Sequence, residues 1–229
     1  MSVKRISQFF NPSSVAVIGA SNSPNRAGFV VMRNLLQGGF KGPIMPVSLN
    51  HSAVHGVLAY PSIASLPKVP DLAVICTNKN TLKDIIKELG ELGCKHAVII
   101  AAGLNPDQKQ HLKDAAQAAN VSLLGPNCLG LLIPHIGLNA SFSHTVASSG
   151  KLAFVSQSAA VCSTILDWAK NKEIGFSYFV SVGDCIDINF DELLDFLGRD
   201  AKTKAILLYI DNIEDIRSFI SAARAAAFS

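Results

Sequence analysis

A short apolar segment, Val15 to Ile18, is followed at once by Gly19 and then by the pattern of a helix. Four apolar residues in a row suit a strand that is buried on both faces of a parallel sheet. The helix places Phe29, Val30, Met32, Leu35 and Leu36 on one face, and Gly38 and Gly39 end it. Such a unit predicts a phosphate cradle, because free backbone N–H groups meet the positive end of the helix dipole there. Gly19 and Gly28 do not form G-x-G-x-x-G, so an ordinary tight turn stays an alternative.

Strand and helix signals alternate along the rest of the chain, which is typical of an α/β protein with a largely parallel sheet. The expected strands are 42–50, 72–76, 97–100, 121–124, 151–155, 176–180 and 205–210. The expected helices are 81–93, 106–120, 160–170, a short one ending at 197, and 213–227. Little periodicity remains in 136–149. We therefore expect a domain over 1–135, a linker over 136–149, and a second domain over 150–229 that is cut short after its last helix.

The second strand carries no carboxylate at its end, where NAD-binding units place Asp or Glu for the ribose hydroxyls. Arg26, Lys41 and His51 are near instead. These side chains favour a ligand with an additional phosphate, such as NADP or coenzyme A, although each of them suits a solvated surface equally well. Ligands of open α/β sheets bind beyond the carboxyl ends of the strands, where the loops at Gly19, Thr77 and Gly125 fall.

Composition narrows the functional classes. Lysine and arginine exceed aspartate and glutamate by three (20 against 17) without a basic cluster, which gives no support for binding to nucleic acid or membranes. No apolar run approaches the ~20 residues that span a bilayer, and no secretory signal follows Lys4 and Arg5. Five cysteines lie scattered among the 229 residues, which suggests reduced thiols, no metal site and a cytoplasmic location.

Four motifs in order give the chain a family resemblance. They are F-F-N-P-S-S-V-A-V-I-G-A-S at 9–21, L-L-G-P-N-C-L-G-L at 123–131, G-K-L-A-F-V-S-Q-S-A-A at 150–160 and D-A-K-T-K-A-I-L-L-Y-I at 200–210. The chain resembles the NDP-forming acyl-CoA synthetases, which include the α chain of succinyl-CoA synthetase. N-R-A-G at 25–28 and G-L-N-A-S-F-S at 137–143 are most similar to the synthetase-like region of large bacterial protein lysine acetyltransferases.

The resemblance implies a Rossmann-like CoA-binding domain followed by a flavodoxin-like domain of the succinyl-CoA-synthetase type. It implies coenzyme A or acetyl-CoA as the ligand, with ATP bound only by a further part of a longer parent protein. The implied ligand residues are Gly19, Ala20, Ser21, Asn25 and Arg26 for the phosphates, Pro46, Val47 and Thr77 for the adenosine and pantetheine arm, and Gly125, Pro126 and Asn127 for the thioester end. The turn at Ser156, Gln157 and Ser158 matches the helix start that stabilises a phosphorylated histidine in that family.

Three departures set this chain apart from active synthetases. It contains no Gly-His-Ala-Gly motif, Ala159 replaces a glycine that tolerates left-handed backbone angles, and Asp211 stands where a glutamate is usual. The leading hypothesis is therefore an acetyl-CoA-sensing fragment of a lysine acetyltransferase that is not catalytic alone. Its partners would be CoA or acyl-CoA and the C-terminal domains of its parent, and a homo-oligomer is left open.

Three alternatives remain. One is a fragment of an active ADP-forming acyl-CoA synthetase, and another is an NADP-dependent reductase, which the absence of a Tyr-x-x-x-Lys pair disfavours. The third is a scaffold whose sites have all been lost. Cys128 falls in the loop of the thioester end, and we interpret it as a small residue, not a nucleophile, because no basic residue lies close to it in sequence.

Overall fold

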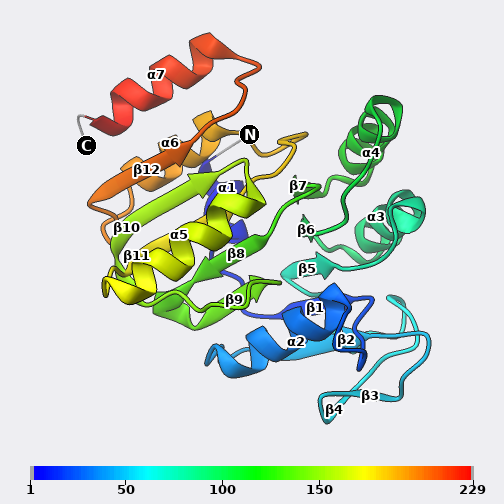
Figure 1. Ribbon diagram of the computed structural model, residues 1–229. Coiled ribbons are helices and arrows are strands. Elements are labelled where there is room, and N and C mark those ends of the chain that lie inside the picture. Colours follow the sequence, from blue (N-terminus) through cyan, green and yellow to red (C-terminus); the bar gives the residue numbers. More distant parts are fainter. Residues whose placement is uncertain (1–2, 228–229) are drawn as a thin grey trace.

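The computed structural model describes residues 3–227, which form two α/β units packed side by side (Figure 1). The first sheet has the order β2-β1-β5-β6-β7, and all neighbouring strands are parallel. Its strands are β1 Val15–Ile18, β2 Ile44–Val47, β5 Leu72–Ile75, β6 His96–Ile99 and β7 Ser122–Leu124. The chain leaves β1 toward β2 and returns to β5 on the other side, so the strand order reverses between β1 and β5. Ligands of open α/β sheets bind at such a reversal, beyond the carboxyl ends of the strands.

Helices cover both faces of this sheet. They are α2 Ala27–Gln37 on one face, and α3 Leu82–Leu92 and α4 Pro106–Ala119 on the other. Successive side chains of β1 alternate between the two cores: Val15 and Val17 pack with α2, whereas Ala16 and Ile18 pack with α3 and α4. The short strands β3 Ala53–Val54 and β4 Val57–Leu58 form a hairpin, and the 3₁₀ helix η1 Lys79–Thr81 precedes α3.

The second sheet has the order β12-β10-β11-β8-β9. Its strands are β8 Gly130–Ile133, β9 Leu138–Ser141, β10 Ser149–Ser156, β11 Phe176–Ser181 and β12 Ala205–Tyr209, and the 3₁₀ helix η2 Pro134–Ile136 joins β8 to β9. β10 pairs in parallel with β11 and β12, whereas β8 is antiparallel to β11 and β9. α5 Ala159–Asn171 covers one face and α6 Phe190–Gly198 the other, with α7 Ile216–Ala227 against α6 (Figure 1). No helix within residues 3–227 is both long and apolar enough to cross a bilayer.

The first helix, α1 Val3–Phe9, leads into a pair of aromatic rings that contact both units. The Phe9 ring lies edge-on to His96 of β6, with 5.4 Å between ring centroids. The Phe10 ring stacks on Phe196 of α6 at 5.2 Å and meets Tyr178 of β11 edge-on at 5.7 Å. The start of the chain therefore holds the two units together.

A buried amide provides a second connection between the units. Asn34 of α2 donates from Nδ2 to the carbonyl oxygens of Ser141 and Ser143, at 2.8 Å each. The largest apolar core is shared as well, because it contains Val17 of β1 and Val180 of β11. The two units thus share one continuous interior, and their relative placement is fixed by packing.

The structure changes the expected layout in three places. The segment 136–149, expected as a linker, contains the fully buried strand β9, and β8 just before it was not expected. In this four-residue strand Leu138 and Ala140 enter the apolar core, while the alternate residues are polar, buried and bonded to each other, Ser141 Oγ donating to Asn139 Oδ1 at 2.7 Å. The last helix begins at Ile216, three residues after the expected start at Ile213, and α1 was not expected.

Candidate functional site

Two glycines bring three elements together at the strand-order reversal of the first sheet. Gly19 has φ +85°, and a Cβ atom at this position would lie 2.8 Å from Cγ2 of Thr77, which follows β5. A Cβ at Gly28 would lie 2.1 Å from the carbonyl oxygen of Gly19. Only glycine therefore allows the turn after β1 to touch both the end of β5 and the first turn of α2.

The free N–H groups of this turn differ from those expected. Gly19 and Ala20 both donate their N–H to the carbonyl oxygen of Val47 at 3.0 Å, so these two groups are already used. Ala27 and Gly28, the first residues of α2, have N–H groups with no hydrogen-bond partner among residues 3–227. The donors available to an anion are therefore at the start of α2, while Gly19 and Ala20 shape the turn.

The polar side chains around the turn divide between the two edges of the sheet. Arg26 is the N-cap residue of α2, and its exposed guanidinium makes no cap bond. Asn25 is exposed beside it, and Ser21 is buried, with its Oγ accepting from the N–H two residues later. His51 follows β2 on this edge, but Lys41 precedes β2 and lies at the opposite, amino edge. Of the expected cations, Lys41 cannot reach the crevice.

The second strand presents little side-chain surface to a ligand. Pro46 and Val47 are both buried, and the Val47 carbonyl is taken by the turn. Leu49, two residues beyond β2, is 90% exposed on the crevice edge and was not singled out from the sequence. Thr77 is half-buried, and its Oγ1 accepts from the Thr81 hydroxyl at 3.0 Å. Leu49 is therefore the apolar side chain of this edge that is free to cover a flat ring.

The loop after β7 is held in place through its backbone. Gly125 has φ +98°, and a Cβ there would lie 2.5 Å from the Ile99 carbonyl oxygen. Pro126 follows a cis peptide bond, and both residues are buried. Asn127 has φ +60° and donates its N–H to Ala101 at 2.8 Å, but its side chain is exposed. Of the three predicted residues, Asn127 alone offers a side chain to a ligand.

The neighbouring thiol, Cys128, is buried and hydrogen-bonded. Cys128 is 1% exposed, and its Sγ donates to the Ile99 carbonyl oxygen at 3.2 Å. Burial raises the pKa of the Cys128 thiol to about 12, so the reactive thiolate is scarce near neutral pH. The structure supports the interpretation of Cys128 as a small packing residue.

The second sheet has its own strand-order reversal, between β10 and β12, where the predicted phosphate loop lies. Ser156 Oγ accepts from the Ser158 N–H at 3.0 Å, and Ser158 Oγ caps α5 by accepting from the Val161 N–H at 3.2 Å. These two serines thus satisfy the loop internally. The N–H groups of Ala159 and Ala160 have no partner among the described residues. Ala159 has helical angles as the first residue of α5, so its replacement of glycine causes no backbone strain.

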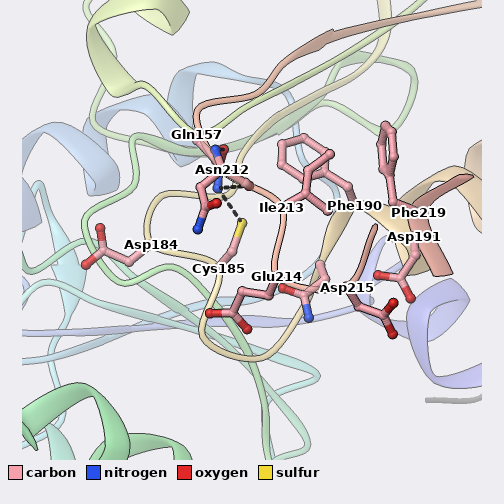
Figure 2. A pocket seen from close by; sticks show the side chains of 11 residues that line it. Gln157, Asp184, Cys185, Phe190, Asp191, Asn212, Ile213, Glu214, Asp215 and Phe219 are labelled. Carbon is pink, nitrogen blue, oxygen red and sulfur yellow. Dashed lines mark hydrogen bonds between the residues drawn. The ribbon is translucent and has the colours of Figure 1, made fainter. Parts of the chain in front are cut away.

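Gln157 ties this loop to the end of β12. Its Oε1 accepts from the N–H groups of Asp211 and Asn212, at 2.6 and 2.9 Å, and its Nε2 donates to the Asn212 carbonyl oxygen at 3.0 Å. Figure 2 shows this clamp at one wall of a small cavity of about 100 Å³. Four carboxylates line the cavity: Asp184, Asp191, Glu214 and Asp215.

The two reversals are connected by the loop between β11 and α6. The Asp184 N–H donates to the Pro126 carbonyl oxygen at 2.9 Å. A Cβ at Gly183, which has φ +56°, would lie 2.1 Å from the same oxygen. The carboxyl end of the first sheet and the phosphate loop of the second therefore border one region of the molecule.

Comparison with known proteins identifies the family. A family model described as a CoA binding domain matches residues 13–134, and one described as a succinyl-CoA ligase like flavodoxin domain matches residues 149–229. The α subunit of acetate–CoA ligase [ADP-forming] II from Pyrococcus furiosus is 41% identical over 224 residues, which make up 94% of this chain and 48% of that subunit. The chain belongs to the NDP-forming acyl-CoA synthetase family.

Other members of this synthetase family give the same result. The ADP-forming acetate–CoA ligase of Methanocaldococcus jannaschii is 37% identical, with 93% of this chain and 30% of that protein aligned. The dinucleotide forming acetyl-coenzyme A synthetase 1 of Ca. Korarchaeum cryptofilum, solved with phosphate and ADP, superposes with a TM-score of 0.92 at 34% identity, over 99% of this chain and 49% of that one. The chain spans about half, or less, of the length of these relatives.

These relatives are acyl-CoA ligases. They confirm the NDP-forming synthetase resemblance and the combination of a Rossmann-like and a flavodoxin-like unit. They favour the ADP-forming synthetase alternative over the lysine acetyltransferase hypothesis, whose motifs N-R-A-G and G-L-N-A-S-F-S are too short to separate two branches of one family.

Proposed function

We propose that this chain is the CoA-binding part of an ADP-forming acyl-CoA synthetase. The observation that carries the proposal is the pair of strand-order reversals, whose loops border one region and whose helix starts each leave two N–H groups free. One helix start would receive a phosphate of coenzyme A and the other a phosphoryl group. The names of the relatives support acetate or another small acid as the acyl donor.

The nucleotide half of coenzyme A would bind at the turn after β1. The N–H groups of Ala27 and Gly28 and the dipole of α2 favour an anion there, and Arg26 adds a full positive charge. The exposed side chain of Leu49 would cover the adenine ring. Gly19, Ala20, Ser21 and Asn25 would shape and border this site, as would Pro46, Val47 and Thr77.

The thioester end would bind at the loop Gly125 to Asn127. From β1 to β7 there are three strand spacings, about 14 Å in all, which an extended pantetheine arm covers. The N–H groups of Ala159 and Ala160 in the second unit would hold a phosphoryl group during transfer. Binding of ATP and pairing with further domains or chains would belong to the longer protein.

Isothermal titration with coenzyme A, acetyl-CoA and NADP tests the proposal. Arg26→Ala should weaken binding of coenzyme A roughly tenfold, because a charge-assisted contact contributes about 1.5 kcal/mol. Lys41→Ala is the matched control: it removes another exposed cation at the opposite edge of the sheet and should leave the affinity unchanged.

The outcomes separate the hypotheses. Binding of NADP but not coenzyme A would favour the reductase alternative, and binding of neither would refute the proposal. Equal losses in the Arg26→Ala and Lys41→Ala variants would place the phosphates elsewhere.

A further inference from the structure

The loop 182–189 of the second unit is fixed against the end of β7 in the first. Besides the contacts of Gly183 and Asp184 with Pro126, the Leu123 N–H donates to Oδ2 of Asp187 at 2.7 Å, and the Ile188 N–H donates to the Leu123 carbonyl oxygen at 3.2 Å. This loop therefore pairs with the outer strand of the first sheet, and its side chains have fixed positions relative to the thioester loop.

Both carboxylate oxygens of Asp184 bind side chains of the first unit. Oδ1 accepts from Nδ2 of Asn127 at 3.1 Å, and Oδ2 pairs with Nζ of Lys109 of α4 at 2.8 Å. The Asp184 side chain is 18% exposed. A carboxylate has only acceptor atoms, so Asn127 must present its NH₂ group to Asp184. The carbonyl Oδ1 of Asn127 is then turned the other way and has no partner among the described residues.

The backbone of Asn127 is fixed, so the orientation of its side-chain amide decides what it presents to a ligand. Its backbone is in the left-handed region and its N–H is bound to Ala101, so rotation of the terminal amide is the remaining freedom. An exposed asparagine amide without a fixed partner presents either a donor or an acceptor to a ligand. Asp184 removes this choice.

We propose that Asp184 is a positioning residue for the thioester end of coenzyme A. It holds Asn127 so that Oδ1 accepts a hydrogen bond from an amide N–H of the pantetheine arm. This inference rests on the proposed function, and it assigns to the second unit a direct part in CoA binding by the first. Lys109 supports this arrangement, because its ammonium group pairs with the Asp184 carboxylate and holds it in place.

Asp184→Asn tests the inference. The Lys109 ammonium attracts the carbonyl oxygen of the new amide, whose NH₂ group then faces Asn127 and turns Asn127 Nδ2 toward the ligand. Titration should show coenzyme A binding roughly tenfold more weakly. Adenosine 3′,5′-bisphosphate, which lacks the pantetheine arm, should bind as it does to the unaltered chain. Asp195→Asn is the matched control, because that carboxylate pairs with Arg199 at the end of α6 and has no part in the contacts with Asn127; it should change neither affinity.

A reciprocal exchange gives a second test. Asn127→Asp places two carboxylates opposite each other and should weaken coenzyme A binding. The Asn127→Asp, Asp184→Asn double variant places the donor at position 184, which restores a donor–acceptor pair and leaves an acceptor at position 127 facing the ligand, so it should recover most of the affinity. Thermal unfolding of each variant shows that it is folded.

Several outcomes would overturn the inference. An unchanged ratio of the two affinities in Asp184→Asn would do so, as would a double variant that binds coenzyme A no better than Asp184→Asn. Failure of the unaltered chain to bind either ligand would instead overturn the proposed function, and this inference with it.

Discussion

Acidification should destabilise this fold through one buried histidine. His96 of β6 is 4% exposed, and its Nδ1 has no hydrogen-bond partner among residues 3–227. Burial lowers the pKa of His96 from 6.5 to about 4, with Arg5 and Lys95 lowering it further and Asp71 opposing them. The native state therefore keeps His96 neutral while the unfolded chain takes up a proton.

The sign and size of the change in the free energy of unfolding follow from the difference in pKa between the two states. Well above pH 6.5 the imidazole is neutral in both states, so His96 adds no pH dependence there. As the pH falls from 6.5 to about 4, the unfolded state binds more protons, and the free energy of unfolding decreases by at most about 1.4 kcal/mol per pH unit. The total loss is about 3 kcal/mol, and below pH 4 the native state is protonated as well.

Urea titrations of the unaltered chain and of His96→Leu between pH 7.5 and 4.5 measure this effect. Other groups titrate in both proteins, so the difference between the two free energies isolates position 96. The variant should gain stability relative to the unaltered chain as the pH falls, by about 2 to 3 kcal/mol over the range. A difference that stays constant with pH would refute this assignment.

Three further predictions concern packing and reactivity. Gly28→Ala should weaken coenzyme A binding at least tenfold and lower the free energy of unfolding by about 1–3 kcal/mol, because the added Cβ would lie 2.1 Å from the Gly19 carbonyl oxygen. In the same titration Gly39→Ala, whose Cβ would meet no atom within 4 Å, should leave binding unchanged. Asn34→Leu leaves two buried carbonyl oxygens unpaired and should lower the free energy of unfolding by about 2–4 kcal/mol, whereas an unchanged urea midpoint would contradict the bridge. Cys128 should resist iodoacetamide at pH 8 in the native state and react after unfolding, and rapid native labelling detected by mass spectrometry would show that the thiol is accessible.

Local patterns were sufficient to predict most elements. The strands β1 and β5 are continuous apolar runs, β6 is an apolar run after His96, and α3 carries its apolar residues on one face, so each element is encoded within its own segment. α1 has only seven residues, and its Phe9 ring packs on His96 far along the chain, a contact that no local pattern reports.

The sequence predicted which loops share the carboxyl edge of the first sheet, whereas their use by a ligand stays a prediction. The carboxyl ends of the strands follow from the βα order, which placed Gly19, Thr77 and Asn127 on one edge. The donors were less predictable, because the N–H groups of Gly19 and Ala20 are taken by a neighbouring strand. Asp184 could not be found, because its contact with Asn127 joins residues 57 positions apart in two different units.

The position of Phe10 has a consequence during synthesis of the chain. A ribosome produces the whole first unit before Phe196 leaves the exit tunnel, yet Phe10 packs on Phe196 and Tyr178. Until then the Phe10 ring lacks two of its ring contacts, and incomplete packing of this kind leaves apolar surface on a nascent domain. Completion of the first unit therefore waits for the second, and Phe10 reaches its final contacts only after residue 196 has been translated.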